Sequence, residues 1–333
     1  MKKINPIKEK TLQASQNTYN DLFKDVGYYI KTKLKARGIH DLIAYIYAKK
    51  IKNKNILDIG CGLGRFSFIS SRTAKQVVGI DMTENAISCA KIIQNSLNIK
   101  NIDFILSTIE DYETDQKFDF ILLSGTLEHI IDVDMFFKKI KKLLKPSGTF
   151  ITDSPSEFNF RGIFHASLWK LFNFPMTLSD VRIVTPNFIK DKCKQYDMEL
   201  VKTVGTLFSR GWGKAAVSDL KERIPNVLKD VEKETSQIDI NIDNYINWLE
   251  DAGNVFENLL ENWEKTNLIS RIPEKREFSF SPEKKVLNKY NLPVENIKEY
   301  LSPDFSIDPF YSENEEISLL GGNIIYEIYQ KRK

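Results

Sequence analysis

The sequence predicts an α/β protein built on a doubly wound, seven-stranded and mostly parallel sheet. From Asn55 onward, short apolar segments alternate with amphipathic helical segments, which is typical of a parallel sheet covered on both faces. Residues 11–50 show helical spacing with many aromatic side chains, so helices are expected before the sheet. About 110 residues before the last strand lack a strand pattern and predict a mainly helical insertion.

The first five strands and the helices between them follow from this alternation. Strands are predicted at 55–59, 76–81, 102–106, 118–123 and 148–153. Helices are predicted near 63–73, 84–97 and 133–144, and a Lys-Pro-Ser-Gly break at 145–148 precedes the fifth strand.

The C-terminal half supplies two further strands and the insertion. Thr185 and Pro186 predict the start of a helix to about Tyr196, because Thr can cap a helix and Pro is tolerated at its first position. Residues 198–204 and 323–329 predict the sixth and seventh strands, and residues 302–316 predict a loop. Within the insertion, one helical stripe is expected to face the core or a partner: Tyr245, Trp248, Leu249, Ala252, Val255, Phe256, Leu259, Leu260 and Trp263.

These patterns divide the chain into three parts. Residues 1–50 are predicted to form an N-terminal helical cap. Residues 51–208 and 319–333 are predicted to form the core domain that contains the sheet. Residues 209–318 are predicted to form the insertion, which serves either as a lid or as a surface for homo-oligomers.

Composition argues against several classes of partner. The formal charge of +3 comes from 48 basic and 45 acidic residues, so no global field attracts nucleic acid. Three cysteines are too few for a disulfide framework and favour a reducing compartment. No run reaches the roughly 18 apolar residues of a membrane span, and no signal-peptide core follows the basic N-terminus. A cytoplasmic protein is predicted.

The most informative segment is the glycine-rich turn between the first strand and the first helix of the sheet. It reads G-x-G-x-G, with Gly60, Gly62 and Gly64, whereas the dinucleotide pattern G-x-G-x-x-G needs a glycine where Arg65 stands. Asp58 lies two residues before the first glycine, where a carboxylate is badly placed for a pyrophosphate but suits a cation. The turn therefore favours a cationic ligand such as S-adenosylmethionine.

The second strand ends on Asp81, about 20 residues after the turn, where nucleotide-binding α/β folds place an acid for the ribose hydroxyls. Met82 follows and is expected against the face of an adenine. Alternatively, Asp81 or Thr83 caps the next helix.

The run from Ile56 to Asp153 resembles the class I methyltransferase family, especially its quinone and small-molecule O-methyltransferase branch. The matching segments are ILDIGCGLGRFS, VVGIDMTENAI, FILSTIEDY, FDFILLSGTLEHI and LLKPSGTFITDSP. The resemblance implies a Rossmann-like methyltransferase fold and S-adenosylmethionine as the cofactor. One departure is Thr108, where the family often has an acid, so Ile109 is expected to contact the adenine instead.

The resemblance also implies which residues border the cofactor: Asp58, Gly60, Cys61, Gly62 and Gly64 around its methionine part, Asp81 and Met82 at the ribose and adenine, Thr108, Ile109 and Glu110 at the adenine, and Ser124 beside the sulfonium.

The loop after the fourth strand is expected to face the transferred methyl group, because ligands bind beyond the carboxyl ends of parallel strands. It contains Glu128 and His129, the predicted catalytic residues. Histidine suits a general base, and the alternative for His129 is a structural bond at a helix start. No metal site is predicted, since Gly125 stands where the quinone branch carries an additional acid.

The segment 154–184 is expected to cover the methyl acceptor. Its aromatic and basic side chains suit a ring or sugar bearing an anionic group, and the predicted substrate-binding residues are Arg161, His165, Trp169 and Arg182. The expected acceptor is a hydroxyl or amino group on a small biosynthetic intermediate such as a sugar or a quinone-like ring. Two alternatives are a non-catalytic S-adenosylmethionine-binding or assembly protein and an NAD-dependent oxidoreductase.

Overall fold

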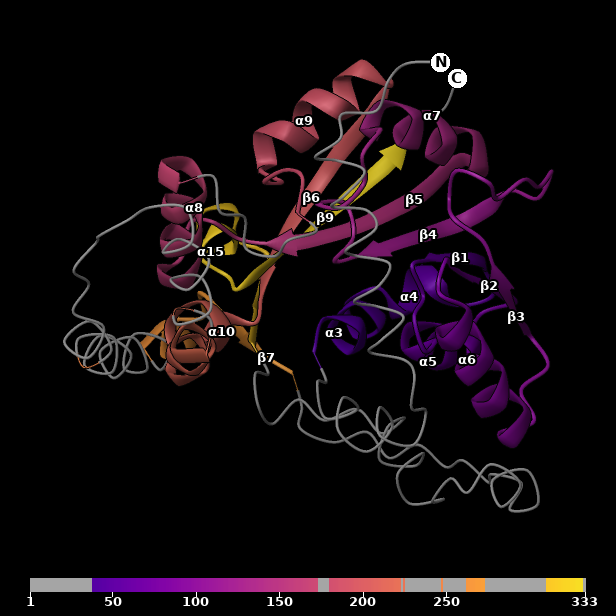
Figure 1. Cartoon of the computed structure of the whole chain (residues 1–333), viewed down its shortest axis with the longest axis horizontal. Coiled ribbons are helices and arrows are strands. Elements are labelled where there is room, and N and C mark those ends of the chain that lie inside the picture. The colour runs from indigo at the N-terminus through magenta and orange to yellow at the C-terminus, as the bar shows by residue number, and fades with distance from the viewer. Residues whose placement is uncertain are drawn as a thin grey trace.

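A computed structural model describes residues 38–172, 180–222, 224, 247, 262–272 and 310–331. One nine-stranded sheet runs through them in the order β3-β2-β1-β4-β5-β9-β6-β8-β7 (Figure 1). Its strands are β1 (Asn55–Ile59), β2 (Gln76–Asp81), β3 (Ile102–Leu106), β4 (Phe118–Ser124), β5 (Leu144–Pro155), β6 (Met198–Thr206), β7 (Ser270–Arg271), β8 (Phe310–Ser312) and β9 (Asn323–Gln330). The helices are α3 (Ile39–Ile46), α4 (Ala48–Ile51), α5 (Arg65–Ser71), α6 (Glu84–Ser96), α7 (Val133–Leu143), α8 (Phe160–Phe172), α9 (Pro186–Gln195), α10 (Phe208–Trp212) and α15 (Glu315–Leu319).

The predicted α/β class is confirmed. Strands β1 to β5 pair in parallel, with β1 between β2 and β4, while β9 pairs antiparallel with both β5 and β6. The chain order therefore reverses between β1 and β4, and such a switch point opens a crevice for ligands at the carboxyl ends of the strands.

The predicted count of seven strands is wrong. Two short strands of the insertion, β7 and β8, extend the sheet beyond β6, with Gly205 and Thr206 of β6 opposite Ser312 and Tyr311. Strands of two and three residues carry no recognisable alternation, so the pattern could not reveal them. The predicted loop 302–316 likewise contains β8 and the start of α15.

Two apolar layers hold the sheet between helices. One core lies toward α3, α5 and α6 and includes Ile56 and Phe120, which are fully buried. The other lies toward α7 and α9 and includes Leu57 and Ile121, also fully buried. Within β1 and within β4, successive residues thus point to opposite faces of the sheet, as they must in any strand. Figure 1 shows the two sets of helices on opposite faces.

The helix predicted from Thr185 is confirmed as α9, where the Thr185 side chain accepts a hydrogen bond from the Phe188 backbone nitrogen at 3.1 Å. No helix among the described residues is long and apolar enough to cross a membrane. The predicted helices of residues 11–37 and most of the apolar stripe at 245–263 lie outside the described residues, and the three-part division stays a prediction.

Candidate active site

The glycine-rich turn holds its predicted shape. Gly60, Gly62 and Gly64 have φ angles of 68°, 53° and 78°, a left-handed region that other residues resist. A Cβ at Gly64 would lie 2.4 Å from the Phe104 ring, so this glycine lets α5 approach β3. A Cβ at Gly62 would meet no atom within 4 Å, so that stretch of main chain faces open space where a ligand can rest. The Cys61 side chain is buried, and its backbone nitrogen donates to the Ile80 carbonyl at 3.0 Å.

Asp58 lies beneath this turn as a buried carboxyl group. It accepts a hydrogen bond from Ser67 Oγ at 2.7 Å, and burial raises its pKa to about 7. The nearby Asp81 raises the pKa further. A cation bound above the turn would favour the ionised form of Asp58.

Asp81 connects the turn to the next helix. One carboxylate oxygen accepts from the Gly62 backbone nitrogen at 2.9 Å and the other from the Thr83 nitrogen at 2.8 Å. Thr83 is the N-cap residue of α6 but its side chain makes no capping bond, and Asp81 bonds the Thr83 nitrogen rather than an amide of the first helical turn. Burial raises the Asp81 pKa, opposed by these hydrogen bonds. The ribose role stays a prediction.

The residues predicted to border the adenine differ in how far they are exposed. Met82 is 37% exposed and Leu106 50% exposed, so apolar side chains are accessible where β2 and β3 end. Ile109 is buried in the core, and Glu110 is exposed. Thr108 Oγ1 donates to Asp111 Oδ2 at 2.9 Å, which directs the hydroxyl into its own turn.

The ends of β4 and β5 meet beside the turn. Ser124 lies opposite Asp153 in the register, and Asp153 also accepts from Asn323 Nδ2 at 2.8 Å. Burial raises the pKa of Asp153 to about 6, opposed by its hydrogen bonds with Ser124 and Asn323. On the turn side, Thr126 Oγ1 would lie 3.2 Å from a Cβ placed on Gly60, so the loops after β1 and β4 are in contact.

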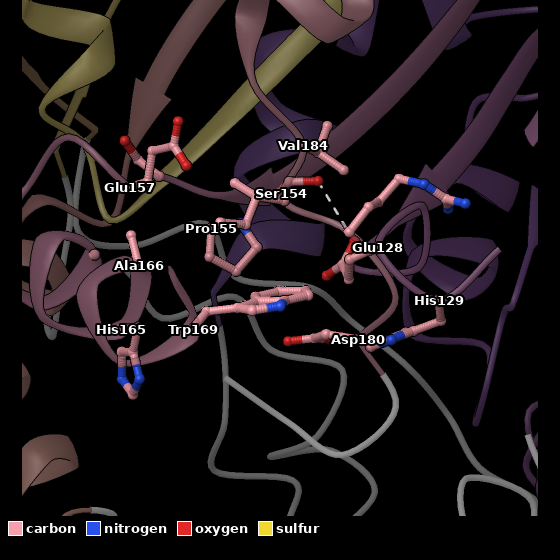
Figure 2. A pocket seen from close by; sticks show the side chains of 14 residues that line it. Glu128, His129, Ser154, Pro155, Glu157, His165, Ala166, Trp169, Asp180 and Val184 are labelled. Atoms are coloured by element: carbon pink, nitrogen blue, oxygen red, sulfur yellow. Dashed lines mark hydrogen bonds and ion pairs between the residues drawn. The ribbon is translucent and has the colours of Figure 1, made fainter. Parts of the chain in front are cut away.

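A pocket with a cavity volume of about 100 Å³ opens beyond β4 and β5 (Figure 2). It brings together five of the predicted catalytic and substrate-binding residues, namely Glu128, His129, His165, Trp169 and Arg182. Its remaining lining comes from 154–157, 162, 166, 180, 183 and 184. The predicted methyl-facing loop and the predicted acceptor cover therefore form one pocket.

His129 is held from across the pocket. Its Nδ1 lies 3.1 Å from Asp180 Oδ1, and the Val181 backbone nitrogen donates to the Glu128 carbonyl at 2.9 Å. The segment after residue 180 thus pairs with the loop after β4. A carboxylate this close to Nδ1 stabilises a proton on that nitrogen, although the pair is not aligned as a hydrogen bond.

Glu128 is 9% exposed and lies within 3.4 Å of Ser154 Oγ. Burial raises its pKa to about 7, and the nearby Asp153 and Asp180 raise it further, whereas His129 lowers it. A carboxyl group with a pKa near 7 can exchange a proton at neutral pH.

The two arginines predicted to grip an acidic acceptor are directed elsewhere. The Arg182 guanidinium donates to the carbonyls of Leu127 at 2.9 Å, Ile131 at 3.1 Å, and Ile130. Arg161 does not line the pocket.

Instead, Arg161 is buried and its Nε lies 2.5 Å from Asp219 Oδ2. His165 Nε2 lies 3.9 Å from the same carboxylate. These contacts join α8 to residues 214–222.

Sequence reasoning missed Asp153, Ser154, Glu157 and Asp180. Asp153 carried a usable signal, because it is a carboxylate at the end of a parallel strand, like Asp81. Asp180 carried none, since it lies in an irregular segment whose contact with His129 depends on the fold. Among the described residues, no group of three His, Cys, Asp or Glu side chains is placed to hold a metal ion.

Comparison with known proteins agrees with this geometry. A family model described as a methyltransferase domain matches residues 50–253, more than half of the chain. The chain is 33% identical over 99 residues to a ubiquinone biosynthesis O-methyltransferase of Bradyrhizobium diazoefficiens, covering 30% of this chain and 39% of that protein. It is 40% identical over 100 residues to the Pelagibacter ubique protein of the same name, covering 30% and 41%. The chain thus spans less than half the length of these two relatives.

Among solved structures, the cyclase SpnF is similar with a TM-score of 0.51 at 11% identity, covering 96% of this chain and 97% of that one. This similarity concerns the fold alone. The match of the family model, together with the parallel sheet, the left-handed glycine turn and Asp81, shows that the chain belongs to the methyltransferase domain family.

Proposed function

We propose that the protein transfers a methyl group from S-adenosylmethionine to a hydroxyl or amino group of a small molecule. The observation that carries this proposal is the adjacency of two features: an open glycine turn above the buried Asp58, and a pocket with Glu128 and His129 at the next strand ends. A cationic methyl donor bound at the turn would have its acceptor beside it.

The residues present fit this cofactor. The bare main chain at Gly62 leaves room for a ligand, and Asp58 is a buried carboxyl group whose ionised form a cation would stabilise. Exposed Met82 and Leu106 offer apolar contact for an adenine. When bound, S-adenosylmethionine supplies an electrophilic methyl carbon on a positively charged sulfur.

We assign His129 the role of general base and Asp180 that of the residue that orients it. The 3.1 Å contact between His129 Nδ1 and Asp180 supports this role, because it leaves Nε2 able to take a proton from the acceptor. The remaining catalysis would come from holding the acceptor in line with the methyl carbon, for which Trp169 and His165 in the pocket wall are suited.

The ligand is tested by calorimetric titration of the full chain with S-adenosylmethionine, S-adenosylhomocysteine and NAD. Binding of the two sulfur ligands, without binding of NAD, is expected. Asp81→Ala is expected to abolish that binding, whereas Asp103→Ala, an exposed carboxylate on β3, is expected to preserve it. Failure of the unchanged protein to bind either sulfur ligand would refute the cofactor assignment.

A further inference from the structure

The pocket wall is rich in carboxyl groups. Glu128, Glu157 and Asp180 all line it, together with the indole of Trp169. Figure 2 shows Glu128, Asp180 and the Trp169 ring around the same space. Carboxylates attract a positive charge, and an indole face stabilises a cation that lies over it.

Among the described residues, the two arginines predicted to bind an acidic acceptor are already engaged. Arg182 spans three main-chain carbonyls of the loop after β4, and Arg161 pairs with Asp219 away from the pocket. Arg182 lines the pocket, but its guanidinium nitrogens donate to main-chain carbonyls, and Arg161 lies outside the lining. An anionic acceptor would therefore lie beside three carboxyl groups and one arginine that is already hydrogen-bonded.

Glu128 is the most deeply placed of the three carboxyl groups, and it lies within reach of Ser154. Burial makes its ionised form costly, which is why its pKa is raised. A cation in the pocket would offset that cost, and an anion would increase it. Asp153 and Asp180 act in the same direction, because their negative charges also favour a cation nearby.

From this arrangement we propose that the methyl acceptor is a small molecule with a protonated amine, recognised by Glu128 and by the face of Trp169. The inference rests on the proposed methyl transfer and selects an ammonium group over an anionic or uncharged acceptor. In the reaction, His129 Nε2 takes one proton from the ammonium group. The nitrogen lone pair then forms the new N–C bond while the C–S bond breaks. The electron pair of the broken C–S bond stays on sulfur.

The charge preference is tested with three probes that share one ring: benzylamine, benzyl alcohol and benzoate. Each is titrated at pH 7.5 into the full chain already saturated with S-adenosylhomocysteine. Benzylamine is expected to bind about tenfold more tightly than either other probe. Formation of N-methylbenzylamine from S-adenosylmethionine is then followed by mass spectrometry.

Glu128→Gln removes the charge and keeps the shape of the side chain. It is expected to weaken benzylamine binding about tenfold and leave benzyl alcohol binding unchanged. Glu199→Gln, an exposed residue of β6, makes the same change far from the pocket and is expected to alter neither. Unchanged affinity for S-adenosylhomocysteine shows that each variant is folded.

The outcomes separate the two proposals. Lack of S-adenosylhomocysteine binding by the unchanged protein would refute the methyl-transfer proposal itself. If S-adenosylhomocysteine binds, the amine proposal is overturned by any of three results. These are benzoate or benzyl alcohol binding as tightly as benzylamine, no benzylamine binding, and unchanged benzylamine affinity in Glu128→Gln.

Discussion

Replacing Asp58 by Asn should stabilise the free protein and remove its cofactor binding. Burial raises the Asp58 pKa from the ordinary 3.8 to about 7. Between these two pH values the folded state keeps a proton on Asp58 that the unfolded state has released. Stability is therefore lost as pH rises from about 4 to about 7, and the full penalty is present above pH 7. The difference in pKa corresponds to about 4 kcal/mol.

Asparagine carries no charge and can still accept the hydrogen bond from Ser67, so Asp58→Asn avoids this penalty. The variant should gain up to about 4 kcal/mol in free energy of unfolding at pH 8, and little at pH 4. Urea unfolding at both pH values measures the gain, and titration with S-adenosylmethionine measures the lost affinity. Asp103→Asn, an exposed site on β3, serves as the matched control.

The reasoning would be refuted by a variant that is folded but no more stable than the unchanged protein at pH 8. A gain that is equal at both pH values would also refute it, because the penalty would then not come from ionisation. Retained affinity for S-adenosylmethionine would show that the carboxylate does not interact with the cofactor.

Three further predictions concern the turn, its support and the base. Gly64→Ala should cost about 2–4 kcal/mol in urea unfolding, since a Cβ would meet the Phe104 ring in a left-handed backbone; wild-type stability would contradict this. Asp41→Ala should lower the free energy of unfolding by about 3–5 kcal/mol, because it removes the carboxylate that lies 2.6 Å from the buried Arg65 guanidinium; a loss below 1 kcal/mol would count against that. Asp180→Asn should lower kcat about 10–100-fold and move the acid limb of the pH–rate profile to lower pH, with S-adenosylmethionine affinity unchanged; an unmoved limb would make Asp180 merely structural.

The helical and strand pattern determined much of the fold. Five parallel strands and the helices α5, α6, α7 and α9 were predicted within a few residues. The helices bury one apolar face that recurs along the sequence, and the central strands are short runs of buried apolar residues. Strands β7 and β8 escaped prediction because they are held by pairing with neighbours rather than by their own pattern.

The glycine-rich turn was equally predictable from sequence. Its glycines have left-handed backbone angles that a tight turn requires, and Asp81 bonds to Gly62, which lies in a neighbouring loop of the same βαβ unit. Short-range geometry of this kind depends on residues close along the chain, so spacing alone reveals it.

The contacts of the charged side chains around the pocket were decided by tertiary structure. The sequence identified Arg161, Arg182 and His129 as functional candidates, but not the partner of each. In the fold, Arg161 meets Asp219, Arg182 meets main-chain carbonyls, and His129 meets Asp180. A charged side chain acts according to what lies within a few ångströms of it, and those neighbours come from segments about 50 residues away in the chain or more. The sequence alone thus determined the family and the position of the glycine-rich turn, whereas the folded chain decided which charged side chains meet around the pocket.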